Sequence, residues 1–206
     1  FMACNPSVGG TAKGQIVREI DALGGEMGIN ADKSLLQIRM LNRGKGAAVR
    51  SLRGQADKNL YHRNMKKTLE QTENLRILQG EAVEILVENG KVRGVKTAFG
   101  GVLYCDAVVL ATGVYLNGSV IAGEWQRSSG PNGFQPANEL TANLIDLGFS
   151  VRRFKTGTPA RVDRKTIDFS RLEIQNGEKD IYPFSYMTER LPVEQMPCYL
   201  TYTTPK

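Results

Sequence analysis

The spacing of apolar positions in the first seventy residues predicts two helices with a strand between them. A helix is expected over 11–23, where apolar residues recur every three or four positions before Gly24-Gly25, at Ile16, Ile20 and Leu23. The short apolar run 35–41 predicts a strand. A second helix is expected over 54–72, with a narrow apolar stripe and a basic opposite face.

From residue 75 the hydrophobic period changes to two, which is typical of strands. Asn89-Gly90 separates two alternating segments and is a strong hairpin signal, because both residues tolerate the positive φ of a type I′ turn. A second turn is expected at 99–101. We therefore predict an antiparallel β-meander over 75–106, with strands at 75–78, 83–88, 92–98 and 102–105.

The run 107–113 is almost continuously apolar and ends in Thr112-Gly113, which predicts a strand buried on both faces of a parallel sheet. Ligands bind at the carboxyl edge of such sheets. A loop is expected over 123–137, then a helix capped by Asn138 and ended by Gly148, a strand at 149–154, and mostly loop beyond it. The predicted fold class is α/β.

Composition removes several classes of protein. No apolar run approaches the length of a membrane span, and no signal peptide is expected, so no membrane partner is predicted. Three widely separated cysteines and one histidine argue against a disulfide framework, a metal site and a Ser-His-Asp triad.

The net charge of +6 is concentrated in two places. Residues 39–67 hold nine basic side chains and one acidic side chain, and a second basic cluster lies over 152–165. Clustered bases favour a polyanionic partner such as RNA, although two solvated faces explain the charge equally well.

A glycine-rich loop precedes the first helix. Gly9 to Gly14 does not match a P-loop, because Gly14 is followed by Gln15-Ile16 instead of lysine and a hydroxyl residue. The loop could still present backbone N–H groups to an anionic ligand. Cys4 lies just upstream, and it is either a nucleophile near a helix N-terminus or a buried, inert thiol.

Read together, a series of motifs resembles the glucose-inhibited division protein A (GidA/MnmG) family of tRNA uridine 5-carboxymethylaminomethyl modification enzymes. They follow the family's order over nearly the whole chain: Cys4-Asn5-Pro6, Lys13-Gly14, Arg39-Met40-Leu41-Asn42, Gln55-Ala56-Asp57, Leu110-Ala111-Thr112-Gly113, Lys155-Thr156-Gly157-Thr158-Pro159 and Thr166-Ile167-Asp168-Phe169-Ser170. The resemblance implies about a third of a family member, lacking the N-terminal FAD fingerprint and the C-terminal part. Such a fragment is expected to be inactive alone.

The resemblance implies a cytoplasmic, homodimeric flavoenzyme that uses FAD, NADH and methylene-tetrahydrofolate. With a GTPase partner, MnmE, it would add a (carboxymethyl)aminomethyl group to C5 of the wobble uridine of tRNA. Three alternatives stay open: a folate-dependent tRNA methyltransferase of the same fold, a dehydrogenase of that fold, and a non-catalytic RNA-binding module.

The resemblance also assigns residues and domains. Cys4 would be catalytic, and the implied FAD contacts are Asn5, Pro6, Gly9, Gly10, Ala82, Val83, Thr112, Gly113 and Ala137, the last replacing a serine frequent in the family. The implied RNA contacts are Lys45, Arg50, Arg53, Lys155 and Arg161. The fold would be part of a two-dinucleotide-binding flavoprotein, with a partial FAD-binding domain over 1–150 and an inserted β-rich domain on the NADH or substrate side starting at 151–206.

Overall fold

The computed structural model describes residues 2–191 and 194–204 and shows a mixed α/β fold. The chain forms two compact units. The first contains the residues up to Arg76 together with those from Thr158 onward, and the second contains Ile77–Gly157.

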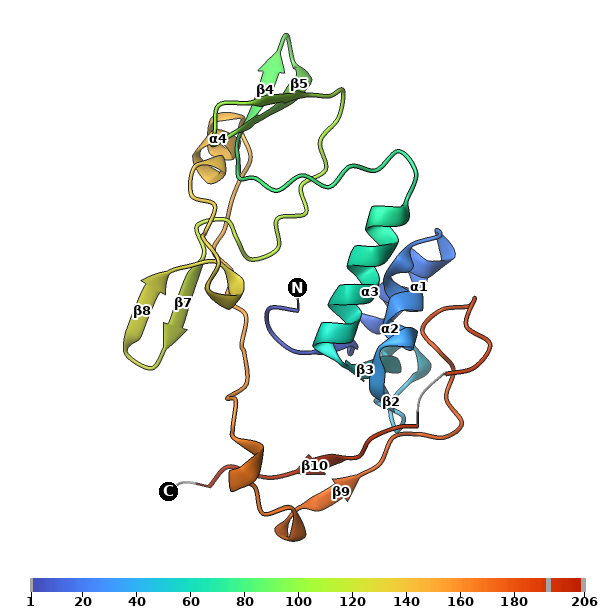
Figure 1. The fold of residues 1–206 in the computed structure, drawn as a ribbon. Coiled ribbons are helices and arrows are strands. Elements are labelled where there is room, and N and C mark those ends of the chain that lie inside the picture. The colour runs from blue at the N-terminus through green and yellow to red at the C-terminus, as the bar shows by residue number, and fades with distance from the viewer. Residues whose placement is uncertain (1, 192–193, 205–206) are drawn as a thin grey trace. The chain divides into compact units, whose positions relative to one another are not determined.

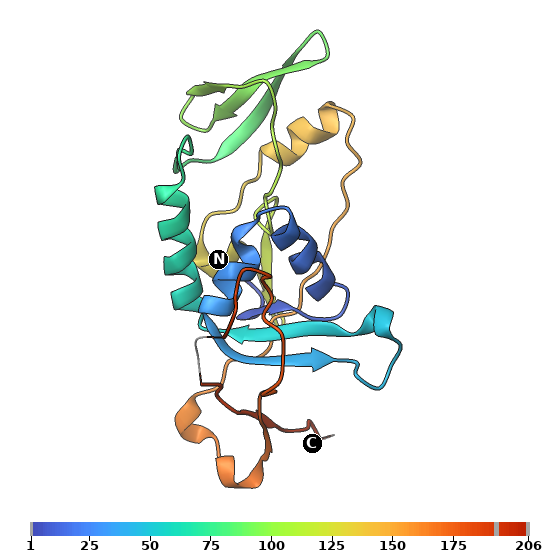
Figure 2. The same cartoon turned by 90° about the vertical axis from the view of Figure 1, so that its right-hand side faces the viewer.

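A small antiparallel sheet organises the first unit. Its strands are β1 (Ser7–Gly9), β2 (Leu35–Leu41) and β3 (Ser51–Ala56), in the order β1-β3-β2. Three helices, α1 (Gly14–Ala22), α2 (Glu26–Lys33) and α3 (Lys58–Gln71), lie on one side of this sheet (Figures 1 and 2). A short 3₁₀ turn, η1 (Ala47–Val49), lies in the β2–β3 loop.

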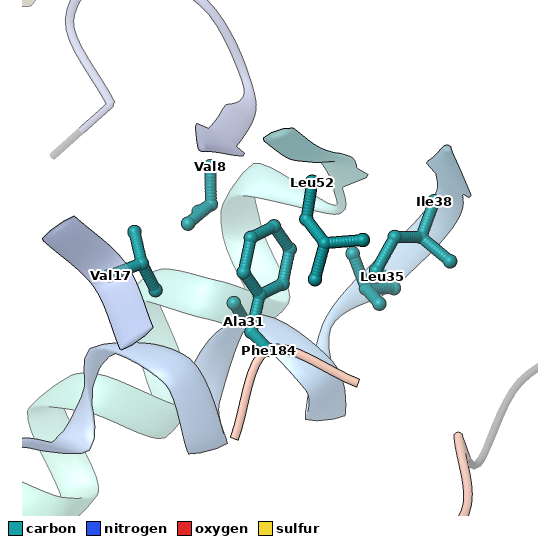
Figure 3. Packing of buried hydrophobic residues seen from close by; sticks show 7 residues of the cluster. All are labelled: Val8, Val17, Ala31, Leu35, Ile38, Leu52 and Phe184. Carbon is teal, nitrogen blue, oxygen red and sulfur yellow. The ribbon is translucent and has the colours of Figure 1, made fainter. Parts of the chain in front are cut away.

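The core of this unit lies between the sheet and the helices. Figure 3 shows the ring of Phe184 among the side chains of the N-terminal elements. The cluster consists of Val8, Val17, Ala31, Leu35, Ile38, Leu52 and Phe184. Phe184 is fully buried although it comes from far along the chain, so the late segment completes the core of the early one.

The rest of the late segment is mostly loop, as expected. It contains 3₁₀ turns η3 (Arg164–Thr166) and η4 (Phe169–Arg171), and an antiparallel pair, β9 (Glu173–Gln175) with β10 (Cys198–Leu200). The side-chain amide of Gln37 joins this segment to β2 by donating to the carbonyls of Gln175, at 2.9 Å, and Met196, at 3.1 Å.

The second unit is built around the predicted meander. β4 (Ala82–Glu88), β5 (Lys91–Thr97) and β6 (Val102–Tyr104) form an antiparallel sheet in that order. Helix α4 (Leu140–Asp146) packs on β4 through Ile85, Leu140 and Leu144. A hairpin, β7 (Ser119–Ala122) with β8 (Trp125–Ser128), and a 3₁₀ turn, η2 (Pro131–Gly133), complete this unit.

Several predicted elements are confirmed. The first helix ends at Ala22, followed by Gly24 in the left-handed region at φ +85°. The strand at 35–41 has the predicted bounds. The hairpin turns at Asn89 and Gly90, both with positive φ, as a type I′ turn requires.

Two errors concern the helical part of the chain. The predicted helix over 54–72 begins only at Lys58, because residues 51–56 form β3 and the Asp57 carboxylate caps the helix by accepting from the backbone N–H groups of Asn59 and Leu60. Helix α2 was not predicted. It has only eight residues, and Gly28 and Asn30 interrupt its apolar pattern.

The apolar stripe predicted for α1 is also wrong. Ile16 and Leu23 are exposed, and the helix buries Gly14, Val17 and Asp21 instead. The reason is the close approach of Gly14 to β3, where an added Cβ would lie 2.7 Å from the Leu52 carbonyl oxygen. This contact turns the small side of the helix, rather than its most apolar side, toward the sheet.

The expected strands at 75–78, 107–113 and 149–154 are not strands in the structure. The described residues offer them no neighbouring strand to complete their hydrogen bonds, and Val109 is 90% exposed. Parallel pairing in the described ranges is limited to one bridge, Leu116 with Ala137, and the multi-strand pairs are antiparallel. The predicted loop over 123–137 contains β8, and α4 begins at Leu140 without a side-chain cap from Asn138.

The second unit ends at Gly157, and the residues from Thr158 onward pack with the N-terminal unit. The assignment of 1–150 to FAD and of 151–206 to NADH or substrate stays a prediction. Within the described ranges, no helix is long and apolar enough to cross a bilayer.

Candidate functional site

The segment from Cys4 to Gly10 contains strand β1, which pairs with the central strand β3 of the first unit. Cys4 is half-buried in the bend before β1, and the Pro6 carbonyl oxygen accepts a hydrogen bond of 2.8 Å from the Ala56 N–H. The Asn5 Oδ1 atom is buried and has no hydrogen-bond partner among the described residues. A buried acceptor of this kind requires a donor, so Asn5 is suited to a ligand that carries an N–H or O–H group.

The glycine loop is held close to β3. At Gly9, with φ +78°, an added Cβ would lie 2.2 Å from the Leu52 carbonyl oxygen, so glycine is required by contact within the chain. Gly10, with φ +99°, is buried: its N–H donates to the Leu52 carbonyl at 2.7 Å and its carbonyl accepts from the Gly14 N–H at 2.9 Å, while the nearest atom to an added Cβ is the Arg53 Cδ at 4.0 Å. Of the two predicted glycines, Gly9 is therefore required by both a close contact and its positive φ, and Gly10 by its positive φ alone.

The β2–β3 loop is tied to the same region. The Asn42 side-chain amide donates to the Thr11 hydroxyl at 3.1 Å and to the Val49 carbonyl at 3.0 Å. The Gln15 side-chain amide donates to the Arg50 carbonyl at 3.1 Å. These contacts connect the basic loop to the glycine loop and the start of α1.

The three predicted RNA contacts within 39–67 lie on this loop or on the strand that follows it. Lys45 and Arg50 are exposed on it, and Arg53 is half-buried on β3, opposite Gly9 on one side and Arg39 on the other. Their neighbour Arg43 is ion-paired with Glu178; this pair lowers the pKa of Glu178 and raises that of Arg43. Arg43 is thus less available to an external anion.

The structure divides the basic stretch 39–67 into two groups. The loop after β2 lies at one end of the hairpin, and α3 begins beyond the other end of β3 (Figure 2), so β3 alone separates the groups by roughly 17 Å. The α3 group contains the exposed side chains of Arg63, Lys66 and Lys67, of which Lys66 is paired with Glu70. The nine bases are therefore not one continuous patch.

Lys155 and Arg161 are both exposed. Lys155 belongs to the second unit and Arg161 to the first. Their part in RNA binding stays a prediction.

The predicted cofactor residues of the second unit lie in two places, on strand β4 and around the turn that follows residue 112. The Thr112 carbonyl accepts from the Tyr115 N–H at 3.2 Å, and the Tyr115 carbonyl accepts from the Ala137 N–H at 3.0 Å, so the segment 112–113 lies close to Ala137. Val83 is buried on β4, and Ala82 packs against the cluster of Ile85, Leu140 and Leu144.

Two buried carboxylates were missed by sequence reasoning. Burial raises the pKa of Asp32, and hydrogen bonds from the backbone N–H groups of Ser185 and Phe184 only partly offset that effect. Asp21 accepts from the Tyr186 N–H at 2.9 Å. One feature of the sequence could have drawn attention to Asp32. It is an acidic residue in the last turn of α2, where the helix dipole disfavours negative charge.

The remaining reactive side chains form no second centre. Cys105 and Cys198 are half-buried thiols without disulfides, Cys105 just after β6 and Cys198 at the start of β10. Within the described ranges, no three histidine, cysteine or acidic side chains come together as a metal site.

Comparison with known proteins agrees with the motifs. The family model described as "Glucose inhibited division protein A" matches residues 1–206. The tRNA uridine 5-carboxymethylaminomethyl modification enzyme MnmG of Clostridium kluyveri is 58% identical over 205 residues, covering 99% of this chain and 33% of that protein. MnmG of Geobacillus thermodenitrificans is 57% identical over 204 residues, covering 99% of this chain and 32% of that protein.

A solved structure has the same fold. The crystal structure of Aquifex aeolicus GidA superposes with a TM-score of 0.91 at 47% identity, covering 99% of this chain and 35% of that one. The chain spans about a third of the length of the curated relatives it matches. Since the family model matches throughout, the chain belongs to the glucose inhibited division protein A family.

Proposed function

We propose that the protein containing this chain is a flavin-dependent enzyme that modifies C5 of the wobble uridine in tRNA, adding a (carboxymethyl)aminomethyl group. The observation that carries the proposal is the 58% identity to an MnmG enzyme over 99% of this chain. The half-buried Cys4 next to the unpartnered Asn5 Oδ1 supports it, because a thiol and a ligand-binding group then stand side by side in the chain.

FAD is the cofactor that the family implies, and the residues of the first unit fit it. Asn5 offers a buried acceptor for a flavin N–H or ribose hydroxyl. Gly10 is kept as a cofactor contact on the family motif alone. Pro6 and Gly9 would fix the backbone between Asn5 and Gly10. We assign residues 82–83, 112–113 and 137 of the second unit to further FAD contacts. When bound, FAD supplies the redox step together with NADH, and methylene-tetrahydrofolate supplies the carbon.

Cys4 is assigned the role of nucleophile. Uracil C5 is a poor nucleophile until a group adds at C6. In the proposed step the Cys4 thiolate forms a bond to C6, and the electron pair of the C5–C6 double bond makes C5 reactive toward the one-carbon unit. Loss of the C5 proton and departure of the Cys4 sulfur then restore the double bond.

The remaining assignments follow the family. We propose a cytoplasmic homodimer acting with a GTPase partner, MnmE. We also propose that the apolar run 107–113 becomes a parallel strand of a dinucleotide-binding sheet in the complete protein, since its exposed Val109 and Leu110 call for a covering layer.

Nucleoside analysis of tRNA tests this function directly. Deleting the complete gene is expected to remove (carboxymethyl)aminomethyl-type modification at the wobble uridine, and mass spectrometry of digested tRNA measures it. An intact gene copy supplied in trans should restore the modified nucleoside. Unchanged wobble uridine modification in the deletion strain would contradict the proposal, and a purified complete protein that never contains flavin would favour an RNA-binding module.

Charge removal tests the RNA contacts. Changing Arg50, Arg53, Lys155 or Arg161 to alanine should weaken tRNA binding and reduce the slope of log affinity against log salt by roughly one for each lost phosphate contact. Lys91→Ala, at an exposed position on β5 outside both basic clusters, is the matched control and should leave the slope unchanged. Equal slopes in wild type and in all four variants would refute these contacts.

A further inference from the structure

The segment from Pro183 to Tyr186, here called the strap, is held against α1 and α2. Side chains of these helices accept hydrogen bonds from its backbone N–H groups or donate one to its backbone carbonyl. The two Asp32 carboxylate oxygens accept from the Phe184 and Ser185 N–H groups at 2.8 and 2.9 Å. Asp21 accepts from the Tyr186 N–H at 2.9 Å. Three consecutive backbone donors are thus held by two buried carboxylates, an arrangement that fixes the strap more firmly than neutral hydrogen bonds would.

Arg18 on α1 also contacts the strap. Its guanidinium donates to the Pro183 carbonyl at 2.8 Å and lies 4.9 Å from the centre of the Tyr186 ring. A charged group therefore contacts each end of the strap. Asp32 is fully buried in the last turn of α2, a place that is unfavourable for a carboxylate unless such donors are present.

The strap delivers the Phe184 ring to the β1–β3 pair. An added Cβ at Gly9 would lie 2.9 Å from the Phe184 Cε1 atom, and one at Gly54 would lie 3.0 Å from its Cε2 atom. The ring therefore packs directly on the backbone of both strands, as Figure 3 shows for its place beside Val8 and Leu52. Gly54 is the register partner of Val8.

In sequence, Cys4 lies between two residues that belong to, or pack against, the core cluster around Phe184. Val8 belongs to the cluster around Phe184, and Met2 packs against the same cluster. The segment that carries Cys4 and Asn5 is therefore anchored on both sides to a core whose largest buried side chain comes from residue 184. Removing the ring would loosen both anchors while leaving the residues of the segment unchanged.

We propose that Phe184, held by Asp32, is a positioning residue that sets the exposure and geometry of Cys4. The effect of Phe184 on catalysis rests on the proposed function of Cys4. The effect of Phe184 on the exposure of Cys4 does not depend on that function. Phe184 acts through β1 and the Met2 anchor. Asp32 acts one step further away, through the backbone of the strap.

Site-resolved alkylation of the complete, folded protein tests the proposal. Iodoacetamide labelling followed by mass spectrometry reports the rate at Cys4, with Cys105 of the second unit as internal reference. Phe184→Ala is expected to raise the Cys4 rate at least fivefold and to change the Cys105 rate less than twofold. Phe184→Leu and Asp32→Asn, which keep more of the contacts, are expected to raise the Cys4 rate at least twofold.

A matched control separates positioning from general loss of stability. Leu144→Ala removes a buried side chain from the second unit and should leave the Cys4 rate within twofold of wild type. If Phe184→Ala does not fold, the two milder variants decide the question. The proposal is overturned if the folded Phe184 and Asp32 variants label Cys4 within twofold of wild type, or if Leu144→Ala accelerates it equally. Retained activity in Cys4→Ser would instead refute the catalytic role of Cys4. The alkylation rates would still test whether Phe184 controls the exposure of Cys4.

Discussion

Replacing Cys4 by serine in the complete protein is expected to lower tRNA modification by about 10³-fold or more, with FAD content and stability unchanged. A serine hydroxyl has nearly the size of the thiol but is a far weaker nucleophile at neutral pH. Cys4 is half-buried in a bend before β1, so the exchange leaves the core of the first unit intact. Single-turnover formation of modified uridine measures the loss, and the flavin absorbance of the purified variant measures FAD content.

Cys105→Ser is the control for this change. Cys105 is also a half-buried thiol, and its backbone N–H donates to the Arg93 carbonyl at 3.1 Å. Activity within about twofold of wild type is expected for this variant. Full activity in Cys4→Ser would remove Cys4 from the mechanism. Equal losses in both cysteine variants would point to oxidation or misfolding instead of nucleophilic catalysis.

The sequence correctly predicted those turns and helix ends whose backbone conformation is set by one or two neighbouring residues. Asn89-Gly90 specifies its own hairpin, and Gly24 ends α1 in the left-handed conformation that only glycine adopts without strain. The family motifs located Cys4, Asn5 and Gly10 in one segment, and the structure places that segment against β3. For the hairpin and the helix end, residue identity decides the backbone geometry, so sequence reasoning succeeds; the roles of Cys4, Asn5 and Gly10 stay predictions.

The features that were missed depend on residues distant in sequence. The burial of Asp32 makes sense only once the Phe184 strap is present, and the two residues are 152 positions apart. The buried face of α1 is set by the approach of Gly14 to Leu52, which no helical periodicity reveals. Val109 and Leu110 carry a strand pattern, yet a strand forms only where a neighbour supplies hydrogen bonds.

Adding a methyl group at Gly9 is expected to destabilise the first unit by about 3 kcal/mol, the sum of left-handed backbone strain and overpacking. The new Cβ would lie 2.2 Å from the Leu52 carbonyl oxygen and 2.9 Å from the Phe184 ring. That oxygen cannot simply move away, because it accepts the 2.7 Å hydrogen bond from the Gly10 N–H. Gly9→Ala should therefore disturb the glycine loop and the strand pair together.

Gly24→Ala separates the two causes. Gly24 has nearly the same positive φ, +85° against +78° at Gly9, but nothing lies within 4 Å of its added Cβ. Backbone strain alone should cost about 1 kcal/mol there. Hydrogen exchange of the β1 and β3 amides measures the difference: Gly9→Ala should accelerate it by roughly 100-fold and Gly24→Ala by less than about tenfold. Similar acceleration in the two variants would mean that φ, and not the contact with Leu52 and Phe184, requires glycine at position 9.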